Sequence, residues 1–234
     1  MLDDLGNGRQ PEPFRGELEY IRRDGSTIWT DVIALPLFDQ QGSFQELLGV
    51  SRDISERKRY EHQLMEANQQ LQLLAITDGL TGIWNRRHLE ALIRESIQRA
   101  DRYGEPLSLI LCDIDNFKAI NDHFGHQVGD EVLMEFCRRI RNKLRRSDHF
   151  GRWGGEEFLI LLPHSDGRAG YVLAEQLRQL IVETAFVSVG QVSASFGVAQ
   201  RRRHEPEPEW VRRVDDMLYA AKQGGRNQVT LASG

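Results

Sequence analysis

The sequence is poor in cysteine, in long apolar runs and in positive charge. Its two cysteines, Cys112 and Cys137, are too few for a disulfide framework and show no metal-ligand spacing. Because Cys112 lies within an apolar run, we expect a buried thiol in a reducing cytoplasm. No stretch approaches the roughly 20 apolar residues that a membrane span needs, and the N-terminus lacks the order of a signal peptide. We therefore expect a cytoplasmic protein without membrane insertion.

The net negative charge favours some classes of ligand over others. A net charge of −5 argues against broad nucleic-acid binding, which normally needs a basic face, but a single nucleotide needs only a few local cations. With 40% hydrophobic and 28% charged residues, the composition is that of a soluble globular protein. The 234 residues suffice for one full domain and a smaller piece.

The pattern of residues 15–54 predicts three short strands separated by turns. GELEYIRR and TIWTDVIALPLF alternate between apolar and polar residues, DGS and DQQGS are turns, and FQELLGVSRDI closes the set. Three strands without helices of their own predict a small antiparallel sheet that hardly forms an independent core.

Residues 55–77 change to a helical period with a narrow apolar stripe. The stripe repeats at alternating intervals of four and three residues, at Tyr60, Leu64, Ala67, Leu71 and Leu74. This spacing favours a short parallel coiled coil between two chains, and the alternative is a single amphipathic helix packed on its own domain. About three heptads are marginal alone, so other contacts must help.

Helical and strand-like segments alternate through residues 78–234. The helical segments are RRHLEALIRESIQRADR, VGDEVLMEFCRRIRNKLRR, GYVLAEQLRQLIVE and WVRRVDDMLYAAKQ. The strand-like segments are PLSLILCDID, a hairpin from SDHFGRW to EEFLILLP, VSVGQVSASFGVAQ as a pair or one long strand, and NQVTLA. This mixture predicts an α+β or mixed α/β sheet covered by helices.

Four carboxylates stand at the ends of buried strands. Asp113 and Asp115 end the run LILCDID and, by the period of two, share one face of that strand. In GRWGGEEFLILLP, we expect Gly154-Gly155 to form a two-residue hairpin turn with positive φ. That hairpin could bring Glu156 and Glu157 beside Asp113. Hard oxygen ligands at this density indicate Mg²⁺ and phosphoryl or nucleotidyl transfer, and the alternative is acids that merely cap helices and form turns.

The signature GGEEF resembles the active-site motif of the GGDEF family of diguanylate cyclases. Four further blocks agree with that family in order and spacing: DGLTGIWNRR (78–87), DIDNFKAINDHFGHQVGD (113–130), RRSD (145–148) and LYAAKQGGRN (218–227). The resemblance implies an α+β fold like that of polymerase palms and nucleotidyl cyclases, with a central, mostly antiparallel sheet flanked by helices. It also implies that two GTP become cyclic di-GMP and two pyrophosphates across a homodimer.

The resemblance assigns the catalytic and metal-binding roles to the strand-end carboxylates. Asp113, Glu156 and Glu157 match the catalytic residues, and together with the Ile114 carbonyl they match the ligands of two Mg²⁺ (or Mn²⁺) ions per site. Glu156 is also a candidate for assisting deprotonation of the 3′-hydroxyl. Asp115 is not a metal ligand in the family and is left out.

The resemblance also assigns substrate and product contacts. Asn121 and Asp130 match the guanine readers; a carboxylate can accept from N1–H and the amino group of guanine, a donor pair that adenine lacks. The phosphate-binding set comprises Lys118, Lys222, Arg226 and the backbone N–H groups of residues 115–118, which include Phe117. Arg145 and Asp148 match an inhibitory product site, although Gln176 stands where many inhibited members have Arg.

The N-terminal segment resembles the closing half of a PAS domain. The resemblance covers about 45 residues, too few for the helices that wall a PAS ligand pocket, so we expect neither haem nor flavin. The predicted organisation is an incomplete PAS half (1–54), a coiled-coil signalling helix (55–77) and a GGDEF domain (78–234). The alternative function is a catalytically silent module that acts as a receptor for cyclic di-GMP or GTP. A cyclase with another product, such as cyclic AMP–GMP, is disfavoured by Asn121 and Asp130.

Overall fold

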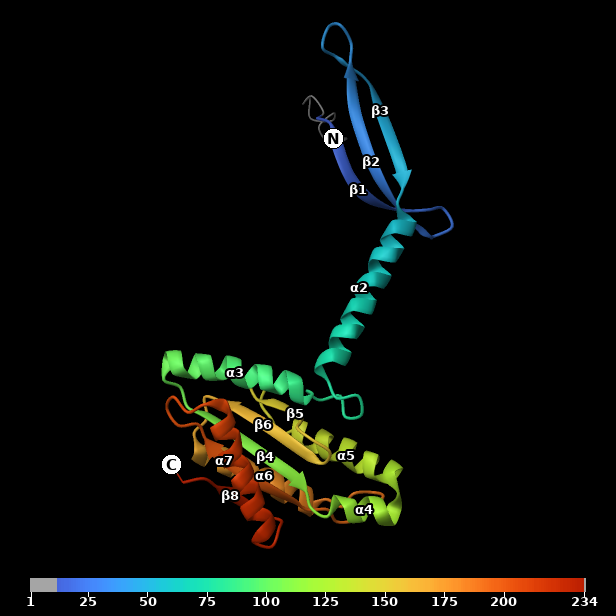
Figure 1. Cartoon of the computed structure of the whole chain (residues 1–234). Helices are drawn as coiled ribbons and strands as arrows, with labels where there is room; N and C mark the ends of the chain where they lie inside the picture. Colours follow the sequence, from blue (N-terminus) through green and yellow to red (C-terminus); the bar gives the residue numbers. More distant parts are fainter. Residues whose placement is uncertain (1–11, 234) are drawn as a thin grey trace. The chain divides into compact units, whose positions relative to one another are not determined.

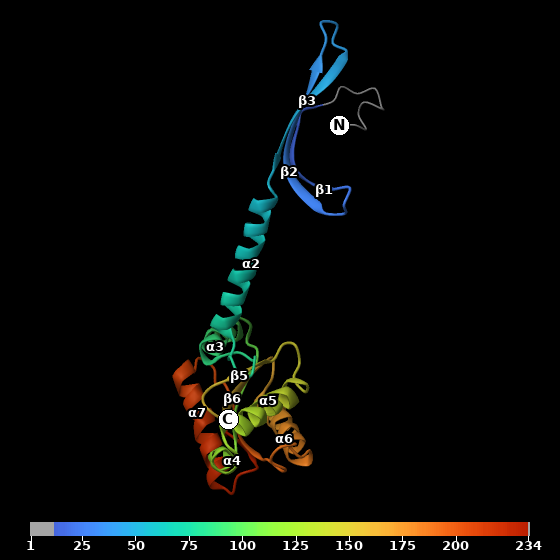
Figure 2. The same cartoon turned by 90° about the vertical axis from the view of Figure 1, so that its right-hand side faces the viewer.

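The computed structural model describes residues 12–233, without the side chains of residues 68–74. The chain divides into two compact units, one up to Gln72 and one from Leu73. Each is described by itself (Figures 1 and 2). Within the described residues, no helix combines the length and the apolar character that are needed to span a bilayer.

The first unit contains the predicted three-stranded sheet. Strands β1 (Phe14–Ile21), β2 (Thr27–Phe38) and β3 (Phe44–Asp53) pair antiparallel in the order β1-β2-β3. Few apolar side chains are buried in it; Ala34 and Ile54 are the buried ones among the described residues. The sheet therefore matches the expected partial PAS fold.

Helix α2 (Ser55–Ile76) follows the sheet and carries the predicted apolar stripe. Tyr60 and Leu64 are 57% and 64% exposed in the single chain. The described part of the stripe is therefore not packed on its own unit, which counts against the single-helix alternative. Leu71 and Leu74 fall where side chains are not described, and the coiled coil stays a prediction.

The second unit is built around a five-stranded sheet in the order β5-β6-β4-β7-β8. Its strands are β4 (Leu107–Ile114), β5 (His149–Arg152), β6 (Glu157–Pro163), β7 (Ala194–Gln200) and β8 (Val229–Leu231). All pairings are antiparallel except that of β7 with β8. The predicted α+β fold with a mostly antiparallel central sheet is confirmed, and VSVGQVSASFGVAQ supplies a single strand, β7.

Helices cover both faces of this sheet (Figure 2). They are α3 (Arg86–Tyr103), α4 (Phe117–Phe124), α5 (His126–Arg141), α6 (Gly167–Glu183) and α7 (Glu207–Gln223). Alternate residues of β4 enter two cores: Ile110 and Cys112 pack with α5 and α6, whereas Leu109 and Leu111 pack with α3 and α7. Both cysteines are free and buried; burial was expected for Cys112 and was not predicted for Cys137. All residues of the central strand β4 are buried, so Asp113 stands at the end of a fully packed strand.

Candidate active site

The register of the central strands brings two of the predicted carboxylates side by side. Asp113, at the end of β4, is directly opposite Glu157, the first residue of β6, and on its other side opposite Ser195 of β7. Opposed residues of an antiparallel pair point to the same face of the sheet. The backbone N–H of Ile114 donates to the Glu156 carbonyl at 3.4 Å, so the loop before β6 is joined to the end of β4.

The loop that carries the two glycines differs from the predicted two-residue turn. β5 ends at Arg152 and β6 begins at Glu157, which leaves a four-residue loop. The N–H groups of Trp153 and Gly154 donate to the Glu157 carbonyl at 2.8 and 3.2 Å. Neither Gly154 nor Gly155 is among the residues with positive φ, so the expected conformational reason for the glycines is wrong. The Glu157 N–H also donates to the Gly154 carbonyl at 3.3 Å, so Gly154 and Glu157 close the loop across Gly155 and Glu156 without positive φ.

The glycines instead leave open space beside the carboxylates. A Cβ added at Gly155 would have no heavy atom within 4 Å, and one at Gly154 would meet only the Glu157 Oε2 atom, at 3.1 Å. The two backbones are thus accessible from outside, which suits close approach of a ligand to the main chain.

Burial and nearby charged side chains shift the pKa of Asp113. Burial raises the pKa of its carboxyl from the ordinary 3.8 to about 6; the Lys222 ammonium opposes this rise, and the charges of Glu156 and Glu157 add to it. Lys222 Nζ lies 2.8 Å from Asp113 Oδ2. In the described residues no three acidic, His or Cys side chains converge tightly enough to hold a metal ion as they stand. The carboxylates are adjacent, and a lysine now neutralises the most buried of them.

Asp115 has a different environment from Asp113. Its carboxylate accepts hydrogen bonds from Ser193 Oγ at 2.7 Å, Ser195 Oγ at 2.6 Å and the Asn227 N–H at 3.0 Å. Three donors satisfy this buried carboxylate and join the end of β4 to the start of β7 and to the loop before β8. Ser193 and Ser195 were not predicted, because isolated serines in an apolar strand give no signal of their distant acceptor.

The predicted guanine-reading residues lie on the two helices, α4 and α5, that meet at one corner of the domain. Asn121 is half-buried on α4, and Asp130 is exposed in the first turns of α5. The residue before Asp130, Gly129, lies against the Asn121 side chain. Lys118 is exposed three residues before Asn121, and residues three apart share one face of a helix.

Of the predicted phosphate-binding N–H groups, one is already engaged. The Asp115 N–H donates to the Ser193 carbonyl at 2.9 Å, so the expectation for residues 115–118 is wrong at its first position. Asn116 adopts a left-handed conformation (φ 55°), and its side chain forms no cap for α4. The N–H groups of Asn116, Phe117 and Lys118 lie in the first turn, where a helix supplies no internal acceptors. Arg226 is exposed in the loop after α7.

Arg145 and Asp148 lie in the turn between α5 and β5. Asp148 Oδ2 accepts from the Arg145 N–H at 2.9 Å, and the Asp148 N–H donates to the Arg145 carbonyl at 3.1 Å. Arg141, Arg146 and Trp84 join them in lining a cavity of about 470 Å³. Both hydrogen bonds use the main chain of Arg145 to close the turn. The Arg145 side chain takes part in neither bond and lines the cavity.

Comparison with known proteins places these elements in one family. The model of the family described as "Diguanylate cyclase, GGDEF domain" matches residues 75–228. The chain belongs to the GGDEF family. A PAS-domain model matches residues 2–56, in agreement with the N-terminal resemblance.

Several curated proteins are similar to this chain. Diguanylate cyclase DgcM of Escherichia coli K12 is 36% identical over 231 residues, which cover 99% of this chain and 53% of that protein. A diguanylate cyclase of Vibrio cholerae is 42% identical over 185 residues, 78% of this chain and 55% of that protein. The chain thus spans about half the length of the curated relatives it matches.

Two solved structures share the fold of the second unit. The coiled coil and GGDEF domain of DgcB from Caulobacter crescentus, in complex with c-di-GMP, is 29% identical with a TM-score of 0.72, covering 76% of this chain and 97% of that one. The active GGEEF domain of a diguanylate cyclase from Vibrio cholerae is 40% identical with a TM-score of 0.60, covering 62% and 95%.

One contact in this GGDEF domain was missed by the sequence reasoning. Arg152 Nη1 lies 3.2 Å from Asp78 Oδ1, and its Nε donates to the Gly155 carbonyl at 2.8 Å. Burial alone would raise the pKa of Asp78, but hydrogen bonds from Thr81 and the charge of Arg152 outweigh it and lower the pKa. The segment that follows α2 is therefore tied to the signature loop. Asp78 and Arg152 are 74 residues apart, and no local pattern pairs them.

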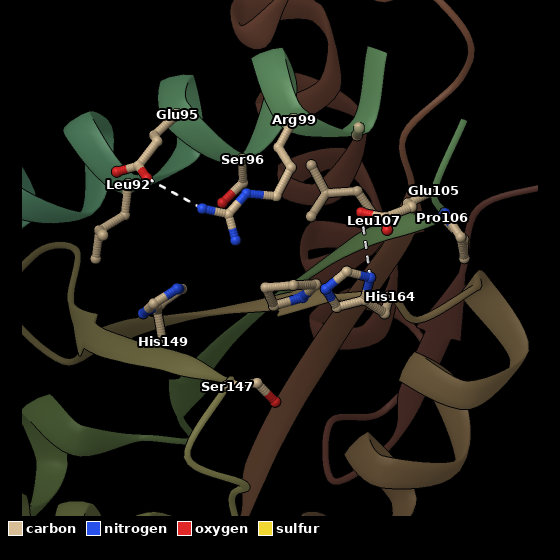
Figure 3. A pocket seen from close by; sticks show the side chains of 12 residues that line it. Leu92, Glu95, Ser96, Arg99, Glu105, Pro106, Leu107, Ser147, His149 and His164 are labelled. Atoms are coloured by element: carbon tan, nitrogen blue, oxygen red, sulfur yellow. Dashed lines mark hydrogen bonds and ion pairs between the residues drawn. The ribbon is translucent and has the colours of Figure 1, made fainter. Parts of the chain in front are cut away.

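A further pocket of the GGDEF domain, of about 230 Å³, lies at the other end of the central strands (Figure 3). Leu107 and Pro163, which line it, face each other at the end of the β4–β6 ladder opposite to Asp113 and Glu157. Both His149 and His164 line this pocket. None of the sequence-predicted site residues does.

Proposed function

We propose that the chain is a diguanylate cyclase that condenses two GTP into cyclic di-GMP and two pyrophosphates. The observation that carries the proposal is the pairing of Asp113 with Glu157, with Glu156 next in the chain, at the end of the central strands of a GGDEF domain. A relative with the same GGEEF signature is described as an active diguanylate cyclase domain, and a second is solved with c-di-GMP.

The carboxylates fit a divalent cation. The oxygens of Asp113, Glu156, Glu157 and the Ile114 carbonyl would hold two Mg²⁺ (or Mn²⁺) ions, for which hard oxygen donors are the preferred ligands. Burial and the neighbouring charges of Glu156 and Glu157 raise the pKa of Asp113, and a cation bound beside these carboxylates would offset both effects. Bound there, the ions would polarise the α-phosphate and lower the pKa of the 3′-hydroxyl.

The chain's own side chains would bind and orient GTP. Asn121 and Asp130 would read the guanine from the α4–α5 corner. Lys118, Arg226 and the first-turn N–H groups of α4 would contact the triphosphate, where a helix start favours anions. The Lys222 ammonium would leave its ion pair with Asp113 and bind a phosphate oxygen of GTP. Glu156 would accept a hydrogen bond from the 3′-hydroxyl and take its proton.

Two chains are needed because one site binds one GTP. In the condensation, each 3′-oxygen attacks the α-phosphorus of the other GTP, one P–O bond forms and one breaks at each phosphorus, and two pyrophosphates leave. We propose that residues 55–77 form the coiled coil that brings the two sites face to face. The exposed Tyr60 and Leu64 support this interface. On this organisation residues 1–54 are a PAS half and residues 78–234 the cyclase domain.

Product inhibition is proposed to act through Arg145 and Asp148. The guanidinium fork of Arg145 suits the Hoogsteen edge of guanine or a phosphate, and the cavity beside it is lined by two further arginines. Gln176, exposed on α6, would not supply the charge that arginine gives at this position in many inhibited relatives. We therefore expect inhibition with fewer contacts.

The proposal is tested by nucleotide specificity. The purified chain is incubated with Mg²⁺ and either GTP or ATP, and pyrophosphate release is measured over a range of protein concentrations. We expect release from GTP alone, with a specific activity that rises with protein concentration as dimers form. The alternative, a silent receptor for cyclic di-GMP or GTP, predicts nucleotide binding without pyrophosphate from a sample that is shown to be dimeric.

A further inference from the structure

The corner between α4 and α5 folds the second helix back onto the end of the first. Gly125 lies between them with a positive φ of 87°, and its N–H donates to the Asn121 carbonyl at 2.8 Å. The Gly129 N–H donates to the Gly125 carbonyl at 3.1 Å. These bonds fix the backbone of Asn121 and bring the first turn of α5 directly over its side chain.

The Asn121 side chain occupies the space where Gly129 has no side chain. A Cβ added at Gly129 would lie 1.9 Å from Asn121 Oδ1, 3.0 Å from its Cγ and 3.3 Å from Phe117 Cζ. The amide of Asn121 forms no hydrogen bond with any other residue that the structure describes. Its position is therefore set by packing against Gly129, and its donors and acceptor remain available to a ligand.

Backbone conformation does not account for glycine at this position. Gly129 lies within α5 and is not among the residues with positive φ. In a helix, alanine is favoured over glycine by about 1 kcal/mol. The helix would thus gain from a methyl group at Gly129, and the Asn121 amide is the group that such a methyl would displace.

We propose that Gly129 is a positioning residue for substrate recognition: the lack of a side chain there lets the Asn121 amide lie against α5 one residue before Asp130, and from these positions the two read the guanine of GTP. The inference rests on the proposed function, because it assigns guanine to this corner. A methyl group at position 129 forces the amide to rotate away, and one recognition contact is lost while the catalytic carboxylates are untouched.

The test is a double-mutant cycle in the full chain, with Gly129→Ala, Asn121→Ala and the two combined. We measure the KM for GTP, kcat, and the Kd for the unreactive α,β-methylene analogue of GTP. Loss of one hydrogen bond corresponds to about a tenfold weaker affinity. We expect each single variant to raise KM and Kd about tenfold with kcat changed less than threefold, and the double variant to be no worse than Asn121→Ala.

Gly170→Ala is the matched control. Gly170 is a buried helical glycine of α6, where an added Cβ would meet Val198 Cγ1 at 3.1 Å, away from the proposed site. We expect it to leave KM and Kd unchanged. Urea unfolding of all variants separates recognition from folding, since Gly129→Ala is expected to leave stability unchanged or raised.

Each outcome decides a different claim. If Gly129→Ala leaves KM and Kd within twofold, or if its effect adds fully to that of Asn121→Ala, the positioning role is overturned. If the analogue binds with the expected cycle but no product forms, the positioning role stands and the cyclase activity fails. If no guanine nucleotide binds the wild-type chain, both claims are overturned.

Discussion

Replacing Asp113 by Asn should stabilise the protein at neutral pH while removing a group that the chemistry needs. Asp113 is buried against Glu156 and Glu157, with Lys222 as its counter-charge. Asparagine keeps the shape of the side chain and removes the negative charge. A residue retained for function at the expense of stability is common at active sites.

The magnitude follows from the pKa of the carboxyl. The difference between about 6 and the ordinary 3.8 corresponds to about 3 kcal/mol, at about 1.36 kcal/mol per pKa unit. Water at the open side of the site screens part of this, so we expect Asp113→Asn to raise the free energy of unfolding by about 1–3 kcal/mol at pH 7.5. Because the pKa of Asp113 is higher in the folded state, its ionisation lowers the free energy of unfolding. This destabilisation is absent below about pH 4 and grows as the pH rises to about 6.

The assay is urea unfolding at pH values from 4.5 to 8 in the presence of a chelator. A Trp29→Phe background leaves the other three tryptophans, all in the second unit, to report on the GGDEF domain. Asp115→Asn is the control, for which we expect a change of opposite sign in the free energy of unfolding. It disturbs three hydrogen bonds to a buried carboxylate and should lower that free energy by about 1–3 kcal/mol.

Two results would refute this reasoning. One is an Asp113→Asn protein that is no more stable than wild type at pH 7.5. The other is a stability difference that does not grow between pH 4.5 and 6.5. Millimolar Mg²⁺ should raise the unfolding midpoint of the wild type and leave that of Asp113→Asn unchanged, since ligand binding to the folded state stabilises it; equal shifts would contradict a metal site at Asp113.

Three further perturbations test other parts of the account. Asp78→Asn should loosen the hold of Arg152 on the signature loop and lower kcat several-fold with little change in KM; an unchanged kcat would remove the loop contact from the account. Arg145→Ala should keep the initial rate, weaken cyclic di-GMP binding at least tenfold and straighten progress curves that flatten in the wild type; curves that still flatten would place inhibition elsewhere. Leu64→Glu should lower specific activity at nanomolar protein and recover it at high concentration, as measured by dilution series; a rate independent of concentration in both proteins would argue against the coiled coil.

The sequence sufficed for elements whose signal is local. The period of two and an apolar run predicted β4 and its terminal Asp113, and a hairpin pattern predicted the β5–β6 pair that carries Glu157. The pairing of β6 with β4, which sets Glu157 opposite Asp113, is specified by neither pattern. The turn itself was predicted wrongly, because Gly154-Gly155 looks the same in a two-residue turn and in a wider loop. The contacts that were missed join distant segments: Asp78 with Arg152, and Asp115 with Ser193. Such pairs depend on how helices and strands pack, and neither residue's neighbours in the sequence indicate its contact.

The central claim is tested most directly by identifying the product that the purified chain makes from GTP. The chain is incubated with GTP and Mg²⁺, and nucleotides are separated and identified by mass spectrometry, with Glu156→Gln as the matched variant. The account predicts cyclic di-GMP with two pyrophosphates per molecule formed, and a loss of at least a hundredfold in Glu156→Gln. Unchanged GTP from a dimeric wild-type sample, or equal product from the variant, would contradict it.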